Sequence, residues 1–130
     1  MGMKDIEHQI QSEYFKRLEW HCNKYPLLKY IYAVPNGGKR SIGVAVKMKR
    51  EGVKRGVPDV FIPFVKFDYS GVKGIIYPGM YLETKTVTGK LSKEQKEYKA
   101  HLEMQGYAYR VCRSADELIE ATADYLNIKL

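Results

Sequence analysis

Two acidic positions in the sequence have the residue types and surroundings to support chemistry. Asp59 follows Pro58 at the start of an apolar stretch, in GVPDVFIPF, and Glu83 stands two residues before Lys85 in MYLETKT. Side chains two residues apart in a strand point to the same face, so we expect Glu83 and Lys85 to lie together. If that face is buried, both charges require partners.

Two carboxylates that adjacent strands bring side by side repel each other unless a cation lies between them. Oxygen-only ligation suits Mg²⁺ or Mn²⁺, which can lower the pKa of a bound water that Lys85 would orient. The alternative is that Glu83 and Lys85 form an ordinary ion pair on an exposed strand, worth under ~1 kcal/mol. A zinc site is not expected, because the two cysteines and three histidines are scattered along the chain.

Length and charge narrow the class of protein and its partner. The 130 residues suit one α/β domain, residues 1–130, with a real core. Lysine and arginine number 22 against 15 acidic residues, for a net charge of +7, which favours nucleic acid as the partner. No apolar run approaches the ~20 residues of a membrane span, and the N-terminus lacks a signal peptide's apolar region. We therefore expect a cytoplasmic protein with no membrane partner.

Apolar periodicity and capping residues predict the elements of the first half. An apolar residue recurs every four positions from Ile6 to Cys22, which predicts a helix over residues 5–23, capped by Asp5 and ended by Pro26. The short segment Lys29–Val34 is rich in aromatic and β-branched residues, which predicts a strand. Ser41 is a plausible cap for a second helix that runs to about Glu51.

The second half alternates strands and helices in the same way. Strands are expected at Val60–Val65, Gly74–Tyr77, Met80–Val87 and Tyr107–Cys112, with a loop or hairpin connection over residues 66–74. Ser92 and Gln95 form a Ser-x-x-Gln capping box that begins a helix ending near Gln105. Ser114 and Glu117 predict a second box at the start of the last helix.

Taken together, these features resemble the PD-(D/E)xK nuclease superfamily. The flanking segments PNGGKR, GVPDVF, YLETKTVTGKLSKEQKEY and GYAYRVCRSADE are similar, more narrowly, to the VRR-NUC (virus-type replication-repair nuclease) domain over nearly the whole chain. The resemblance implies a restriction-endonuclease-like mixed central β-sheet flanked by helices. It also implies hydrolysis of DNA phosphodiester bonds that depends on a divalent metal, Mg²⁺ or Mn²⁺.

The resemblance assigns roles to individual residues. Asp59, Glu83 and the backbone carbonyl of Thr84 become metal ligands, and Lys85 positions the attacking water. The family also places a glutamate on the first helix near the metal. Glu7 is the choice, because it lies one turn before Gln11 beside the apolar stripe. Glu13 is the fallback, and an ordinary solvated charge at Glu7 stays open.

Gln95 resembles a family glutamine that lies behind the Glu-x-Lys strand. The capping box already occupies this side chain, and we expect that it cannot do both. Phosphate contacts are expected from residues that surround the acidic pair in sequence, namely Asn36, Gly37, Gly38, Lys39, Arg40, Lys47, Lys54, Arg55 and Lys90. The alternative for the helix lysines is a solvated basic face.

The resemblance to small phage and bacterial members implies a homodimer that resolves four-way (Holliday) junctions in branched DNA. Part of the apolar stretch Phe61–Tyr81 would then form the dimer contact. Three alternatives remain open. They are a monomeric flap or single-strand nuclease, a catalytically idle nucleic-acid-binding module, and a restriction-type nuclease, for whose recognition segments 130 residues leave little room.

Overall fold

A mixed four-stranded sheet forms the centre of the protein. The computed structural model describes residues 2–35, 41–68 and 74–130. Strands lie in the order β1 (Tyr32–Ala33), β2 (Val60–Ile62), β5 (Met80–Thr84) and β6 (Ala108–Cys112). The β1–β2 and β2–β5 pairs are antiparallel and the β5–β6 pair is parallel. The predicted mixed sheet is therefore confirmed.

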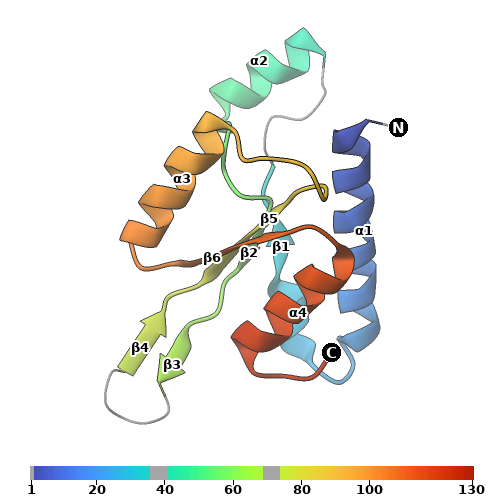
Figure 1. The fold of residues 1–130 in the computed structure, drawn as a ribbon, viewed down its shortest axis with the longest axis vertical. Coiled ribbons are helices and arrows are strands. Elements are labelled where there is room, and N and C mark those ends of the chain that lie inside the picture. Colours follow the sequence, from blue (N-terminus) through green and yellow to red (C-terminus); the bar gives the residue numbers. More distant parts are fainter. Residues whose placement is uncertain (1, 36–40, 69–73) are drawn as a thin grey trace.

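Helices flank this sheet on both sides. α1 (Met3–His21) and α4 (Ala115–Leu126) pack together on one face, and α3 (Lys93–Met104) lies on the other (Figure 1). α2 (Ile42–Arg50) projects beyond the end of the sheet (Figure 1). Within the described ranges, no side chain of α2 is buried. None of the helices in these ranges has the length and apolar composition that a membrane crossing requires.

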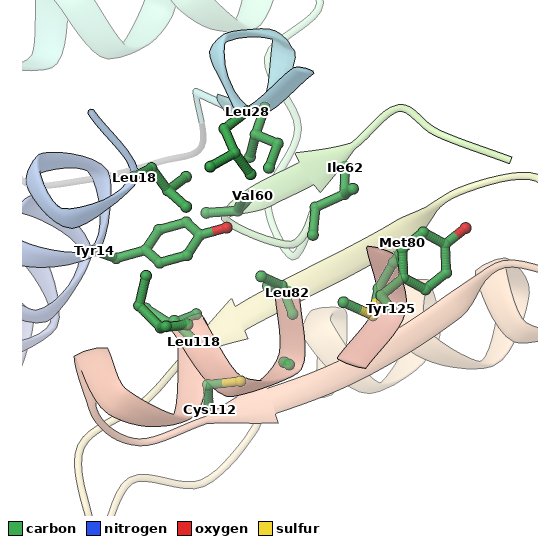
Figure 2. Packing of buried hydrophobic residues seen from close by; sticks show 13 residues of the cluster. Tyr14, Leu18, Leu28, Val60, Ile62, Met80, Leu82, Cys112, Leu118 and Tyr125 are labelled. Atoms are coloured by element: carbon green, nitrogen blue, oxygen red, sulfur yellow. The ribbon is translucent and has the colours of Figure 1, made fainter. Parts of the chain in front are cut away.

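The core lies between the sheet and the α1–α4 layer (Figure 2). Tyr14 and Leu18 of α1 meet Leu82 of β5 and Leu118 of α4, all at most 2 % exposed. The predicted apolar stripe of α1 therefore faces the core. Thr122 donates to the Leu118 carbonyl at 2.8 Å and lies 2.7 Å from the Tyr14 hydroxyl. Because Thr122 has a single hydroxyl proton, Tyr14 is the donor in the second bond.

The two ends of α1 differ from the prediction. The helix begins at Met3 with Gly2 as its N-cap. Asp5 lies in the first turn, where its carboxylate accepts a hydrogen bond from the Gly2 amide at 3.3 Å. The capping assignment for Asp5 was therefore wrong, because an acidic residue at this place stabilises a helix that has already begun. The helix ends at His21, and Pro26 begins a short 3-10 helix, η1 (Pro26–Tyr30).

Most strands are shorter than the sequence predicted. The Lys29–Val34 strand reduces to Tyr32 and Ala33, because η1 takes the first half of the segment. β2 ends at Ile62, before Pro63, which has no amide proton for the ladder. β5 ends at Thr84, and the chain then turns toward α3.

The residues expected to form a loop or hairpin connection contribute a strand of their own. β3 (Lys66–Asp68) pairs antiparallel with β4 (Gly74–Tyr77) in a two-stranded sheet. This hairpin extends away from the helices at the end of the β2–β5 pair (Figure 1). Its apolar side chains Phe67, Ile75 and Ile76 are between 42 % and 59 % exposed.

The capping signals located α3 and α4 well. Ser92 accepts from the Gln95 amide at 3.1 Å, and Gln95 Oε1 accepts from the Ser92 amide at 2.8 Å, so this box is complete. At α4, Ser114 accepts from the Glu117 amide at 3.1 Å. The Glu117 carboxylate, however, accepts from the amide of Arg113, one residue before the cap. The second predicted box is thus only half formed, while the helix start was right.

Candidate active site

Asp59 and Glu83 are brought together by the register of β2 and β5. Val60 lies opposite Leu82 in this antiparallel pair, so one further residue places Asp59 opposite Glu83. At this position the Asp59 side chain, and not a backbone carbonyl of β2, accepts the hydrogen bond from the Thr84 amide, with an N to Oδ2 distance of 2.8 Å. The Asp59 carbonyl accepts from the Val34 amide of the neighbouring segment at 2.8 Å. The aspartate is therefore held on both sides.

Glu83 is a buried carboxyl group that is only half satisfied. The residue is 1 % exposed. Its Oε1 accepts from Gln95, but Oε2 is buried without a hydrogen-bond partner among the described residues. Burial, together with the nearby Asp59, raises the pKa of Glu83 to about 9, while the charge of Lys85 opposes this rise. Among the described residues no group donates to Oε2, so this oxygen requires a cation or a proton shared with Asp59.

Gln95 both caps α3 and holds Glu83. While its Oε1 accepts from the Ser92 amide, its Nε2 donates to Glu83 Oε1 at 2.7 Å. The expectation that one side chain cannot do both was wrong, because a carboxamide has an acceptor at one end and donors at the other. The start of α3 is thereby fixed to the acidic residue of β5.

Lys85 lies between the acidic pair and α1. Its amide donates to the Cys112 carbonyl at 2.9 Å, and its Nζ lies 3.9 Å from Glu7 Oε1. Burial raises the pKa of Glu7, Lys85 opposes this effect, and Asp59 adds to it. Glu7 therefore belongs to the same electrostatic cluster as Asp59 and Glu83. Glu13, the fallback, is exposed and does not line the cleft described below.

The loop that carries Asp59 is pressed against the start of α3. Gly56 has a φ of +86°, and a Cβ built there would lie 2.5 Å from the backbone of Glu94. Only glycine adopts this backbone conformation without strain, and here it also lacks the atom that would clash. Gly56 thus allows the Pro-Asp segment to approach the helix that carries Gln95.

These residues line a cleft of about 1520 Å³ that extends from α1 to α2. Asp59, Glu83, Lys85, Glu7 and Gln95 all contribute to its wall. Of the predicted phosphate-binding residues, Lys54 and Arg55 line the cleft, whereas Lys47 and Lys90 are exposed and do not. Residues Asn36, Gly37, Gly38, Lys39 and Arg40 lie outside the described residues.

One side of the cleft comes from a stripe of α1 that the sequence prediction passed over. Besides Glu7, this side includes Lys4, His8, Gln11, Ser12 and Phe15. Spacings of three and four residues place such side chains on one face of a helix. The signal was present in the sequence beside the apolar stripe, but only Glu7 and Gln11 were noted. Lys49 of α2 also lines the cleft and was not selected.

A metal site made of side chains alone is not present in residues 2–35, 41–68 and 74–130, where no three His, Cys, Asp or Glu groups could hold an ion. Asp59 and Glu83 form a pair. The unsatisfied Oε2 of Glu83 provides one oxygen of the kind that hard divalent cations bind. The donor set therefore fits such a cation only if backbone or water oxygens complete its coordination.

Comparisons with known proteins agree with this architecture. The model of the VRR-NUC domain family matches residues 4–116. A solved structure described as a VRR_NUC domain protein is 26% identical to this chain, with a TM-score of 0.70, and the match covers 95% of this chain and 89% of that one. No curated protein matches. With a family match over most of its length and the same fold in a solved relative, the chain belongs to the VRR-NUC family of nuclease domains.

Proposed function

We propose that the protein is a divalent-metal-dependent, structure-selective DNA endonuclease. The observation that carries this proposal is the half-satisfied Glu83 carboxyl group opposite Asp59, beside Lys85, in the wall of a large cleft. A buried carboxyl group with an unsatisfied oxygen destabilises a fold. Groups of this kind are found mainly at functional sites, where a ligand satisfies them. An idle nucleic-acid-binding module has no use for this arrangement, since phosphate binding favours positive groups.

Asp59, Glu83 and the Thr84 carbonyl would hold the metal. Bound Mg²⁺ or Mn²⁺ supplies Lewis-acid activation of a water and charge neutralisation at the phosphate. The Lys85 ammonium would orient that water through a hydrogen bond and stabilise charge that develops on the phosphate oxygens. Glu7, on the far side of Lys85, restrains the ammonium. Gln95 fixes Glu83 Oε1 and leaves Oε2 for the ion.

Cationic groups along the cleft would hold the DNA backbone. Lys54 and Arg55 occupy its wall, together with Lys49 of α2 and Lys4 of α1. Lys47 and Lys90, which lie outside this wall, and the segment Asn36–Arg40 are proposed as further phosphate contacts. Contacts of this kind provide affinity without reading sequence, which suits recognition of DNA by shape.

We propose in addition that two copies act together on four-way junctions. The support is the β3–β4 hairpin, whose apolar residues Val65, Phe67, Ile75, Ile76 and Tyr77 are 37–59 % exposed. The described residues of Phe61–Tyr81 therefore include both buried members such as Ile62 and this exposed patch. A twofold dimer through the hairpin would present two equivalent sites to a junction with near-twofold symmetry.

Cleavage assays across DNA structures test the enzymatic proposal. Linear duplex, single strand, flap, replication fork and four-way junction are compared with Mg²⁺ or Mn²⁺. We expect EDTA to stop cleavage, Mn²⁺ to restore it, and Ca²⁺ to support binding without turnover, because its looser geometry places the water poorly. Symmetric paired cuts in the junction support the resolvase. Equal nicking of all substrates supports the monomeric flap or single-strand nuclease, and full activity in EDTA overturns metal dependence.

The mass in solution tests the dimer separately. Light scattering should report roughly twice the 15.0 kDa of one chain. Ile75→Asp in the hairpin should shift this mass toward the monomer, because a charge would be buried in the interface. The matched control is Ile42→Asp on α2, where the side chain is 85% exposed and outside the hairpin. A wild-type monomer would overturn the dimer and leave the nuclease intact.

A further inference from the structure

Arg113, directly after β6, binds the turn that follows the Glu-x-Lys strand. Its Nη1 donates to the carbonyls of Thr86 at 2.6 Å and Gly89 at 2.7 Å, with the Val87 carbonyl at 3.4 Å. Guanidinium–carbonyl hydrogen bonds are charge-assisted and directional. One side chain, from a neighbouring strand, thus fixes the path of this turn.

The turn in question packs against the side chain of Lys85. A Cβ added to Gly89 would lie 3.4 Å from Lys85 Cδ and 3.0 Å from Thr86 Oγ1. Gly89 therefore lies beside the aliphatic part of Lys85, with space between them for no more than a methyl group, and the Lys85 side chain is only 12% exposed. The Lys85 amide is bonded to Cys112, the residue before Arg113. Both the backbone and the stem of Lys85 are thus set from the end of β6.

We propose that Arg113 is a positioning residue for Lys85, acting through the backbone of Gly89. This inference rests on the proposed nuclease function, in which Lys85 orients the attacking water. Without the guanidinium, the turn of residues 86–89 can move away from Lys85, and the aliphatic part of the Lys85 side chain is no longer packed against it. A displacement of about 1 Å at a reacting group can reduce a rate by roughly 10²-fold.

The kinetic test compares Arg113→Met with a substitution at Arg110, an arginine of the strand that precedes it. Arg110→Met is the control, because Arg110 is exposed and its Nη1 lies 3.5 Å from Asp124 Oδ2, away from the turn that Arg113 binds. At saturating metal and DNA, we expect Arg113→Met to lower the single-turnover rate about 10- to 100-fold, with DNA affinity within about twofold. Arg110→Met should match the wild type. An unchanged rate in Arg113→Met overturns the proposal.

A double variant separates positioning from general damage. If Arg113 acts through Lys85, then adding Arg113→Met to Lys85→Met should not reduce the residual rate further. The proposal would be overturned if Arg113→Met lowered the rate as much in the Lys85→Met background as in the wild type. Arg113 would then affect cleavage by a route that does not involve Lys85. If Arg113→Met does not fold, Gly89→Ala replaces it. The added methyl would crowd Thr86 Oγ1 at 3.0 Å and would contact Lys85 Cδ at the ordinary distance of 3.4 Å, while Arg113 stays in place.

A readout without catalysis keeps this inference distinct from the proposed function. Acetic anhydride labelling followed by mass spectrometry measures how accessible each lysine is. We expect Lys85 labelling to rise several-fold in Arg113→Met relative to Lys99, which is 39% exposed in the wild type. Unchanged Lys85 labelling refutes the positioning role even if the protein cuts no DNA. Increased labelling in a protein that cuts no DNA supports the restraint on Lys85 and refutes only the nuclease.

Discussion

Two buried polar groups on opposite sides of the sheet are treated in opposite ways. On the α1–α4 side, the Tyr14 hydroxyl bonds to Thr122, which in turn bonds to the Leu118 carbonyl. On the α3 side, Glu83 has one bonded oxygen and one without a partner in the described part of the chain. The neutral pair is satisfied, whereas the ionisable group is not.

This difference separates the part of the molecule that stabilises the fold from the part that holds reactive groups. A buried hydroxyl pair with partners costs little, while a buried carboxyl group with an unsatisfied oxygen costs free energy. Alternation along β5 brings the two regions within one residue of each other, since Leu82 is part of the core and Glu83 faces Gln95. Substitutions on the two sides should therefore have different effects.

The largest expected effect comes from removing the charged groups of the α3 side. Asp59→Asn, Glu83→Gln and Lys85→Ala should each reduce DNA cleavage by roughly 10³-fold or more, because each change removes a group that acts in the transition state. DNA binding, measured by fluorescence anisotropy, should stay within a few-fold. Glu120→Gln, at an exposed position of α4, is the control. Retained cleavage in the Asp59 and Glu83 variants would remove the basis for the metal site.

The core side should respond in stability and not in chemistry. Leu118→Ala leaves a cavity beside Tyr14 and Leu82, and we expect the free energy of unfolding to fall by about 2–5 kcal/mol. Urea denaturation followed by circular dichroism measures this loss. Val87→Ala, at an 80% exposed position, should stay within about 0.5 kcal/mol of the wild type. The cleavage rate of folded Leu118→Ala should be nearly normal, and a large drop would show that the two regions are coupled.

Gln95 contributes both to the stability of α3, through its bond to Ser92, and to the candidate site, through its bond to Glu83. Gln95→Ala removes both the capping bond to Ser92 and the bond to Glu83, and we expect cleavage to fall about 10- to 100-fold, as for groups that orient metal ligands. Glu117→Ala is the matched control, since Glu117 holds the same position in α4, where its carboxylate accepts from the Arg113 amide and the Ser114 hydroxyl. It should alter stability slightly and cleavage not at all. Equal cleavage losses in both variants would mean that helix capping alone explains the effect.

The smallest effect concerns the pH dependence of stability without metal. Burial raises the Glu83 pKa to about 9, above the 4.5 of an ordinary glutamate. The folded state therefore binds more protons than the unfolded state between these values, and stability should fall as pH rises through this window. Glu83→Gln should flatten this slope and raise the melting temperature near pH 8 by on the order of 5 °C. Thermal melts in EDTA at several pH values measure this, and an unchanged slope would contradict the burial of an ionisable Glu83.

Local signals in the sequence were sufficient for the elements that local physics governs. The Ser92–Gln95 box and the Ser114 cap located α3 and α4, because a cap is a contact within a few residues. Alternation predicted that Glu83 and Lys85 share one strand face, but β5 ends at Thr84, so Lys85 lies just beyond the strand. The periodic stripe of α1 predicted correctly that Tyr14 and Leu18 enter the core, whereas Ile6, at the same spacing, is 37% exposed. Asp5 was misassigned because an acidic residue is favourable both at the N-cap and in the first turn, where it lies.

The tertiary structure decided what depends on contacts between distant segments. The β2–β5 register set Asp59 opposite Glu83, and the packing of α1 chose Glu7 over Glu13 for the neighbourhood of Lys85. The bond from Gln95 to Glu83 could be predicted only once it was known which face of β5 carries Glu83. The need for glycine at position 56 became clear only from the position of the Glu94 backbone. None of these contacts joins neighbours in the chain. The sequence by itself determined the residue types and local elements, whereas the distances between the groups of the site follow only from packing.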